Sequence, residues 1–230
     1  MPVQLQPDEE ERLKVLHRYL VLDTPAEEGF DRITELAAHL FHTPIALVSL
    51  VDRHRQWFKS HPGLSICETE RDAAFCGYAL LSNEVFVVLD TAMDSRFTGN
   101  AFVTGEPVIR FYAGAPLITP EGFHLGSLSS ILDKKPRELF SDRERETLQN
   151  LAEMVMTILD LRLRNKQLEE SEARRRAASE TLNAVLQACP LGIWLQDRSG
   201  SITYCNPVAG PDLRFRIRTC AQPEHSRRDR

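Results

Sequence analysis

The sequence predicts an α+β fold in which a central antiparallel sheet is flanked by helices and followed by a long helix toward the C-terminus. Three observations lead to this prediction. Apolar segments of strand length alternate with segments of helical periodicity. Turn signals that contain Gly or Pro separate the strand segments. Finally, residues 141–187 have the pattern of one long helix, which Ser141 and Glu144 open as a capping box.

Two amphipathic helices are predicted ahead of the first strand. In residues 8–20, apolar side chains recur at helical spacing behind an acidic first turn, so this helix should pack outside the sheet. A break at residues 23–25 separates it from a second helix at residues 26–42, whose single apolar stripe we expect in the core. The stripe consists of Phe30, Ile33, Leu36, Ala37, Leu40 and Phe41.

Five segments are then predicted as strands, with one helical segment among them. Residues 44–52 and 85–90 are buried-strand patterns, and residues 55–63 form an aromatic strand closed by a turn signal. Residues 70–82, which lie between the predicted strands at 55–63 and 85–90, have helical periodicity. Residues 110–117 alternate around a Gly and end near a Pro, which marks a bulge or a strand edge. Residues 124–133 follow across a turn.

The long helix carries a broken heptad pattern. One seam position takes Met154, Leu161, Leu168, Arg175 and Leu182, and the other takes Ile158, Asn165, Glu172, Ser179 and Leu186. Both ends of the seam are apolar and its middle is polar, which lowers coiled-coil stability and fixes register. The pattern favours a parallel homodimer through this helix, and a single solvated linker helix is the alternative.

Several of these segments, in this order, resemble the GAF domain of bacterial signalling proteins. They are PIALVSLVD, RQWFKS, AFC, VVLD, RFYAGAPL, LGSL and KKPREL, and the resemblance covers residues 27–159. One departure concerns the residue two after the Cys of AFC, which is commonly His in these relatives and is Tyr78 here. A ligand contact made by that His is therefore not expected in this chain.

The resemblance implies a pocket between one face of the sheet and the short helices and loops that cover it. Its candidate wall consists of Phe75, Cys76, Tyr78, Asp90, Phe97, Arg110, Phe111 and Tyr112. Aromatic side chains would enclose a planar or apolar ligand, and Arg110 would pair with an acidic group. Strand alternation, however, puts Arg110 and Tyr112 on one face and Phe111 on the other. Arg110 would alternatively bridge to Asp90 or Asp94.

The functional expectation from this resemblance is a sensory input module that binds a small ligand or senses redox state. Its helix would relay the change to an output domain, a histidine kinase or a cyclic-dinucleotide synthase in relatives, which is missing from these 230 residues. We therefore expect no enzymatic activity, and neither a ligand nor a cofactor is identified. The alternatives are a dimerisation scaffold with an empty pocket and a methionine sulfoxide reductase of the same fold.

The cysteines bear on the last alternative. A reductase needs several activated cysteines around its pocket, and only Cys67 and Cys76 fall in the domain core. The five cysteines show no CxxC spacing, so we expect reduced and mostly buried thiols.

After the long helix, residues 188–210 resemble the first hairpin of a PAS domain, with a D-x-x-G turn and Asn206 after the second strand. Residues 211–230 are irregular and rich in Arg, which favours a truncated or frame-shifted chain. The predicted division is thus an N-terminal helix at 1–22, a GAF domain at 23–160, a coiled-coil signalling helix at 161–187, the partial hairpin at 188–210 and the tail at 211–230.

Composition argues against several other functions. The net charge of −5 does not fit the basic face of a nucleic-acid-binding protein. The longest apolar runs, residues 45–51 and 85–89, are too short to span a membrane. The N-terminus lacks a secretory signal, so we expect a cytoplasmic protein. The dispersed histidines show no spacing typical of a metal site.

Overall fold

The computed structural model describes residues 8–71 and 75–209, and these divide into two compact units between Asn165 and Lys166. In chain order the first unit contains α1 (Glu9–Arg18), α2 (Glu28–Phe41), β1 (Ile45–Val51), β2 (Arg55–Ser60), β3 (Glu68–Glu70), α3 (Cys76–Ala79), β4 (Phe86–Val88), α4 (Ala101–Thr104), β5 (Phe111–Ile118), β6 (His124–Asp133) and the first half of α5 (Asp142–Ala188). The strands form one antiparallel sheet in the order β3-β2-β1-β6-β5-β4. The predicted α+β class is confirmed.

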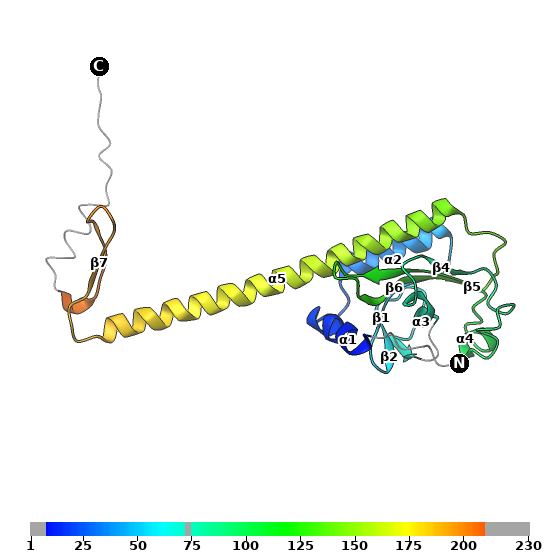
Figure 1. The fold of residues 1–230 in the computed structure, drawn as a ribbon, viewed down its shortest axis with the longest axis horizontal. Coiled ribbons are helices and arrows are strands. Elements are labelled where there is room, and N and C mark those ends of the chain that lie inside the picture. The colour runs from blue at the N-terminus through cyan, green and yellow to red at the C-terminus, as the bar shows by residue number, and fades with distance from the viewer. Residues whose placement is uncertain (1–7, 72–74, 210–230) are drawn as a thin grey trace, which may run out of the picture. The chain divides into compact units, whose positions relative to one another are not determined.

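Two hydrophobic clusters lie on opposite faces of this sheet. The alternation of β1 shows the division, because Val48 and Leu50 join a cluster with α1, α2 and α5, whereas Leu47 and Val51 join a cluster with α4 and the segment around α3. Helix α2 runs beside the first half of α5 (Figure 1). The sheet therefore separates a helical face from a face covered by short helices and loops.

Two sequence expectations for the helices of this unit are wrong. Residues 70–82 are not one α-helix, because Glu70 lies in β3 and pairs with β2, and the α-helix in the described part of this range is α3, which begins at Cys76. Leu36 and Leu40 of α2 are not core residues, since they are 43% and 47% exposed. The buried face of α2 consists of Phe30, Ile33, Thr34, Ala37 and Phe41, and the two leucines lie on its flank.

The N-terminus of α5 has the predicted capping box. The Glu144 carboxylate accepts hydrogen bonds from the Ser141 amide, at 2.7 Å, and from the Ser141 hydroxyl, at 2.6 Å. The Glu144 amide in turn donates to the hydroxyl oxygen of Ser141 at 3.3 Å. These bonds satisfy amide groups that have no partner inside the helix, so α5 begins at a defined residue.

The second unit holds the rest of α5 and a hairpin of β7 (Trp194–Gln196) and β8 (Ile202–Cys205), followed by a short 3-10 helix at Pro207–Ala209. The fully buried Asn206 holds the hairpin to the end of α5, because its amide donates to the carbonyl oxygens of Leu186 and Leu191. The amide of Ile193 donates to the Asn206 side-chain oxygen at 2.9 Å. The predicted Arg-rich tail at 211–230 lies outside the described residues.

No helix among the described residues is long and apolar enough to cross a membrane.

Candidate ligand-binding site

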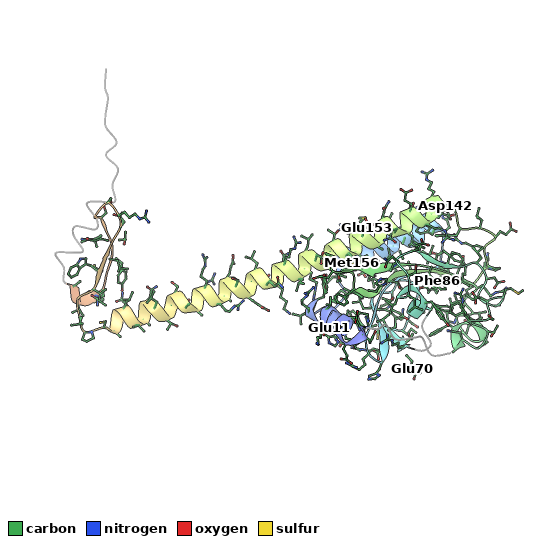
Figure 2. All side chains as sticks on the ribbon, in the orientation of Figure 1. Glu11, Glu70, Phe86, Asp142, Glu153 and Met156 are labelled. Carbon is green, nitrogen blue, oxygen red and sulfur yellow. The ribbon has the colours of Figure 1, made fainter. Side chains whose placement is uncertain are left out.

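Five aromatic rings gather on the sheet face that α3 and α4 cover, and we call them the aromatic cluster. Tyr112 of β5 stacks on Phe75 with ring centroids 5.3 Å apart, and Phe75 lies 4.9 Å from Phe97. Tyr78 of α3 meets Phe97 edge-on at 5.1 Å, and Phe86 of β4 lies 5.8 Å from Tyr112. Figure 2 labels Phe86 in this part of the molecule. Such tilted and offset contacts are favourable for aromatic rings, so the cluster holds its own geometry.

The aromatic cluster has a closed side and an accessible side. Phe75, Phe97 and Tyr112 are at most 5% exposed, so they belong to the core under the site. Tyr78 and Phe86 are only partly buried and pack against that core from outside. Tyr78 and Phe86 therefore form the accessible side of the aromatic cluster.

A guanidinium group covers the accessible side of the cluster. The Cζ atom of Arg96 lies 4.9 Å from the ring centroid of Phe86, 5.5 Å from that of Phe97 and 5.6 Å from that of Tyr78. Asp94 holds it through a hydrogen bond from Nε at 2.9 Å, and this bond raises the pKa of Arg96. The three rings thus already bind a cation supplied by the chain itself.

Arg110 forms a separate ion pair with Asp90. Its Nε and Nη2 atoms donate to the two carboxylate oxygens at 2.8 and 2.6 Å, which is the bidentate geometry that guanidinium groups favour. The hydrogen bond from Arg110 lowers the pKa of Asp90. The amide of Arg110 also donates to the Asp133 carbonyl oxygen, and its own carbonyl oxygen accepts from the Thr91 amide. The ion pair therefore holds the segment between β4 and β5 in place. This agrees with the alternative prediction that Arg110 bridges to Asp90 or Asp94.

Phe111 does not belong to the site, which corrects its place among the candidate wall residues. Its ring lies 5.7 Å from that of Phe140, and the guanidinium of Arg137 lies 4.5 Å from the same ring. Both contacts place it in the hydrophobic cluster with α1, α2 and α5. Alternation along β5 is the cause, because Tyr112 points to the opposite face.

The three cysteines whose side chains the structure describes differ from the expectation of mostly buried thiols, and Cys220 lies outside the described residues. Cys67 is an exposed free thiol, and Cys189 and Cys205 are half-buried free thiols in the second unit. Cys76 lies on α3, but its side chain is outside what the structure describes. Within the described residues, no group of three His, Cys, Asp or Glu side chains is arranged to hold a metal ion.

The structure therefore brings together four of the eight candidates, Phe75, Tyr78, Phe97 and Tyr112, and pairs two others, Asp90 with Arg110. Sequence reasoning missed Phe86 and Arg96. Strand alternation could have predicted Phe86. Val88 pairs with Tyr112, and Phe86 lies two residues from Val88 on the same face of the sheet. Arg96 lies in a segment without periodicity, so no pattern indicated that its guanidinium would cover three rings.

Comparison with known proteins gives one family and one curated relative. The sequence model of the GAF domain matches residues 25–159. A cyclic di-GMP phosphodiesterase of Pseudomonas aeruginosa is 45% identical over 149 residues, which is 65% of this chain and 25% of that protein. The chain thus spans about a quarter of the length of the curated relative that it matches.

Among the solved structures, one superposes with a TM-score above 0.5 and shares the fold. A bacteriophytochrome of the photosynthetic bacterium R. palustris superposes with a TM-score of 0.51 at 12% identity, over 81% of this chain and 43% of that one. The GAF domain of an Acinetobacter phosphoenolpyruvate-protein phosphotransferase gives a TM-score of 0.49 at 15% identity, over 67% and 94% of the two chains. At such identities the likeness concerns the fold alone.

Proposed function

We propose, because this chain belongs to the GAF domain family, that it is the sensory or regulatory input module of a bacterial signal-transduction protein. The input is either a small ligand that binds at the aromatic cluster or a change of redox state. The signal passes through α5 to an output domain. The module itself performs no catalysis in this proposal.

One observation carries the proposal: the sheet has the aromatic cluster on one face and the start of α5 on the other. Tyr112 of β5 belongs to the cluster, and its neighbour Phe111 packs in the core that contains Val155 and Leu159 of α5. A ligand that shifts β5 changes both surfaces, because consecutive residues of a strand point to opposite faces. Such a ligand changes the position of α5 only if it binds the shifted and the unshifted arrangement of β5 with different affinity.

The curated relative favours an output that acts on cyclic di-GMP. That protein is a cyclic di-GMP phosphodiesterase, and the 45% identity over 149 residues makes a related regulatory role for this segment a reasonable proposal. The catalytic activity would belong to a part of the full protein outside the matched region. A histidine kinase output, which the sequence also allowed, has no comparable support.

We also propose that α5 pairs two copies of the chain in parallel. Met154, Leu161, Leu168 and Leu182 are each at least half exposed, and they recur at intervals of seven residues or multiples of seven. An apolar seam of this period is typical of a coiled coil. The boundaries proposed for the coiled coil, 161–187, and for the partial PAS-like hairpin, 188–210, follow from the same patterns. A scaffold that dimerises without a ligand is the alternative.

Native mass spectrometry of the full chain purified from cells tests the ligand proposal. It reports the mass of any retained small molecule together with the oligomeric state. Phe86→Leu removes a ring of the aromatic cluster, and Phe111→Leu is the matched control because it makes the same change on the opposite face. We expect the retained mass to be lost in Phe86→Leu and kept in Phe111→Leu.

Melting temperatures of both variants separate loss of the site from loss of the fold. A retained molecule that survives Phe86→Leu contradicts the placement of the site. A wild-type chain that carries no molecule and forms a dimer favours the scaffold instead.

A further inference from the structure

A cavity outside the aromatic cluster lies where α2 ends, β1 begins and β6 turns toward α5. It is a surface groove that is largely open to solvent, and its volume is about 570 Å³. Two short segments supply the wall, one that closes α2 and one that follows β6. The lining residues are Ala38, His39, His42, Thr43, Pro44, Asp133, Lys134 and Lys135.

The wall of this cavity is predominantly cationic. Two ammonium groups, of Lys134 and Lys135, and two imidazole rings, of His39 and His42, line it beside one carboxylate. That carboxylate belongs to Asp133, and it accepts a hydrogen bond from the backbone amide of Lys135 at 3.1 Å. Even with both imidazoles neutral, the two lysines outweigh the single acidic side chain. The cavity is therefore suited to a ligand of negative charge.

The cationic side chains are not needed to balance other groups. The end of α2 would attract cations, but its last carbonyl oxygens already accept hydrogen bonds from the Thr43 amide, the His42 amide and the Arg137 side chain. Among the described contacts, Lys134 has only a distant ion pair with the exposed Glu106, at 3.6 Å. An anion in the cavity would not have to displace a buried partner.

Two features of the wall are unusual for a surface groove. His42 closes α2 in the left-handed conformation, with φ of 52°, where Gly or Asn is the usual residue. This places its ring edge-on to that of His39, with centroids 6.3 Å apart. Thr43 is buried, and its hydroxyl is without a hydrogen-bond partner among the described residues. Non-glycine residues held in such conformations concentrate at functional sites.

We propose that this cavity binds a small anion of the phosphate class, either a free phosphate compound or the phosphate group of a metabolite. Lys134 and Lys135 provide the charge, and His39 and His42 provide ring N–H donors from the opposite wall. Phosphate oxygens are strong acceptors that several donors can share, so a short cluster of Lys and His suits them. The site is independent of the ligand proposed for the aromatic cluster.

Isothermal titration calorimetry of the full chain with inorganic pyrophosphate tests the proposal. The site variant is Lys134→Ala/Lys135→Ala. The matched control is Lys14→Ala/Lys166→Ala, which removes the same two charges from exposed positions elsewhere. We expect the site variant to weaken binding about tenfold or more, because two charge-assisted contacts are lost. The control variant should bind as the wild type does.

Three results would overturn the proposal. They are no binding by the wild type, equal binding by the site variant, and an equal loss in the control variant, which would mean attraction to net charge alone. Lys134→Arg/Lys135→Arg should bind within about threefold of the wild type, since charge and donors remain. Titration with citrate distinguishes a phosphate site from general attraction of polyanions, and binding of citrate equal to that of pyrophosphate would be a further result against the proposal.

Discussion

The ammonium group of Lys59 donates a hydrogen bond to the Glu27 carboxylate at 2.7 Å, and the Lys59 side chain is completely buried. The same ammonium donates to the Thr24 hydroxyl at 2.8 Å and to the Pro25 carbonyl oxygen at 2.6 Å. Three donors thus meet three acceptors, which is how a buried cation is tolerated. Burial, the largest single effect, would raise the pKa of Glu27, but the hydrogen bonds and positive charges of Lys59 and Arg162 together outweigh burial and lower it.

The same carboxylate oxygen of Glu27 binds α5. Arg162 donates to it from Nε at 3.0 Å and, through Nη1, to the carbonyl oxygens of Tyr19 and Leu20 at 3.1 and 2.9 Å. The Tyr19 hydroxyl donates to the Asp160 carboxylate at 2.7 Å. The segment between α1 and α2 therefore links two elements of the first unit. Through Glu27 it binds both Lys59 of β2 and Arg162 of α5.

Replacing Glu27 with Gln should cost roughly 3 kcal/mol of unfolding free energy, because the Lys59 ammonium stays buried without its countercharge. Urea unfolding measures this cost. Glu28→Gln is the matched control, since Glu28 pairs with Arg32 and both side chains are more than 70% exposed. The control should change stability by less than about 0.5 kcal/mol.

A double variant, Lys59→Met/Glu27→Gln, checks the cause. Removing the buried charge together with its partner should recover part of the loss. If the double variant is less stable than Glu27→Gln, burial of an unpaired charge is not the reason for the effect.

A second buried ion cluster attaches α1 to the sheet. Arg12 is fully buried, donates to the Glu9 carboxylate through Nε at 3.0 Å and through Nη2 at 2.8 Å, and reaches the His124 carbonyl oxygen. Arg71 donates to the same carboxylate at 2.6 Å. Burial alone would raise the pKa of Glu9, but the hydrogen bonds from Arg12 and Arg71 outweigh it and lower the pKa from 4.5 to about 2.

This shift predicts an acid-dependent stability. A carboxyl whose pKa is lowered on folding contributes stability that is complete above the unfolded value of 4.5 and disappears as the pH falls through about 2. Glu9→Gln should therefore be less stable than the wild type by roughly 3 kcal/mol near neutral pH, and the difference should shrink toward zero at about pH 2. Chemical unfolding at a series of pH values measures it.

Glu11→Gln controls for general acid sensitivity, because Glu11 lies on the same helix with more than half of its side chain exposed. Its difference from the wild type should stay small at every pH. A difference for Glu9→Gln that does not change with pH would contradict the role of the carboxylate charge.

Gly126 occupies a position in β6 where no side chain fits. A Cβ atom built there would lie 2.0 Å from the Ser49 carbonyl oxygen and 2.8 Å from the Leu50 Cα atom. Gly126→Ala must therefore push β6 away from β1 and should cost more than about 3 kcal/mol. Gly99→Ala is the control, since a Cβ there meets nothing within 4 Å. Equal melting temperatures of the two variants would contradict this prediction.

The sequence predicted the strands best where burial acts on both faces. Residues 44–52 predicted β1 to within one residue at each end, because every residue of β1 is buried and the apolar run therefore marks the strand. The prediction of a helix at residues 70–82 was wrong at its first residue. Glu70 pairs with Arg55 of β2 and is therefore part of the sheet. Local periodicity does not include a partner strand that lies elsewhere in the sequence.

For the candidate site, strand alternation was sufficient to separate Tyr112 from Phe111. It could not predict that the Arg96 guanidinium, from a loop, would lie against Phe86 and Phe97. The bridge from Arg110 to Asp90 was one of two alternatives, and only the fold decided between Asp90 and Asp94, because Asp94 pairs with Arg96.

The dimer proposed for α5 predicts a definite change in mass. Leu168 is 59% exposed and belongs to the proposed seam with Leu161 and Leu182. In a parallel dimer the two copies of Leu168 would face each other, so Leu168→Glu would bury two like charges and should raise the dissociation constant about a hundredfold or more. Size-exclusion chromatography coupled to light scattering should give twice the chain mass of 26.2 kDa for the wild type and the mass of one chain for the variant. Gln167→Glu adds the same charge one residue away, outside the seam, and should leave the dimer intact. A monomeric wild type would favour a single linker helix, and a dimer that survives Leu168→Glu would contradict pairing through this seam.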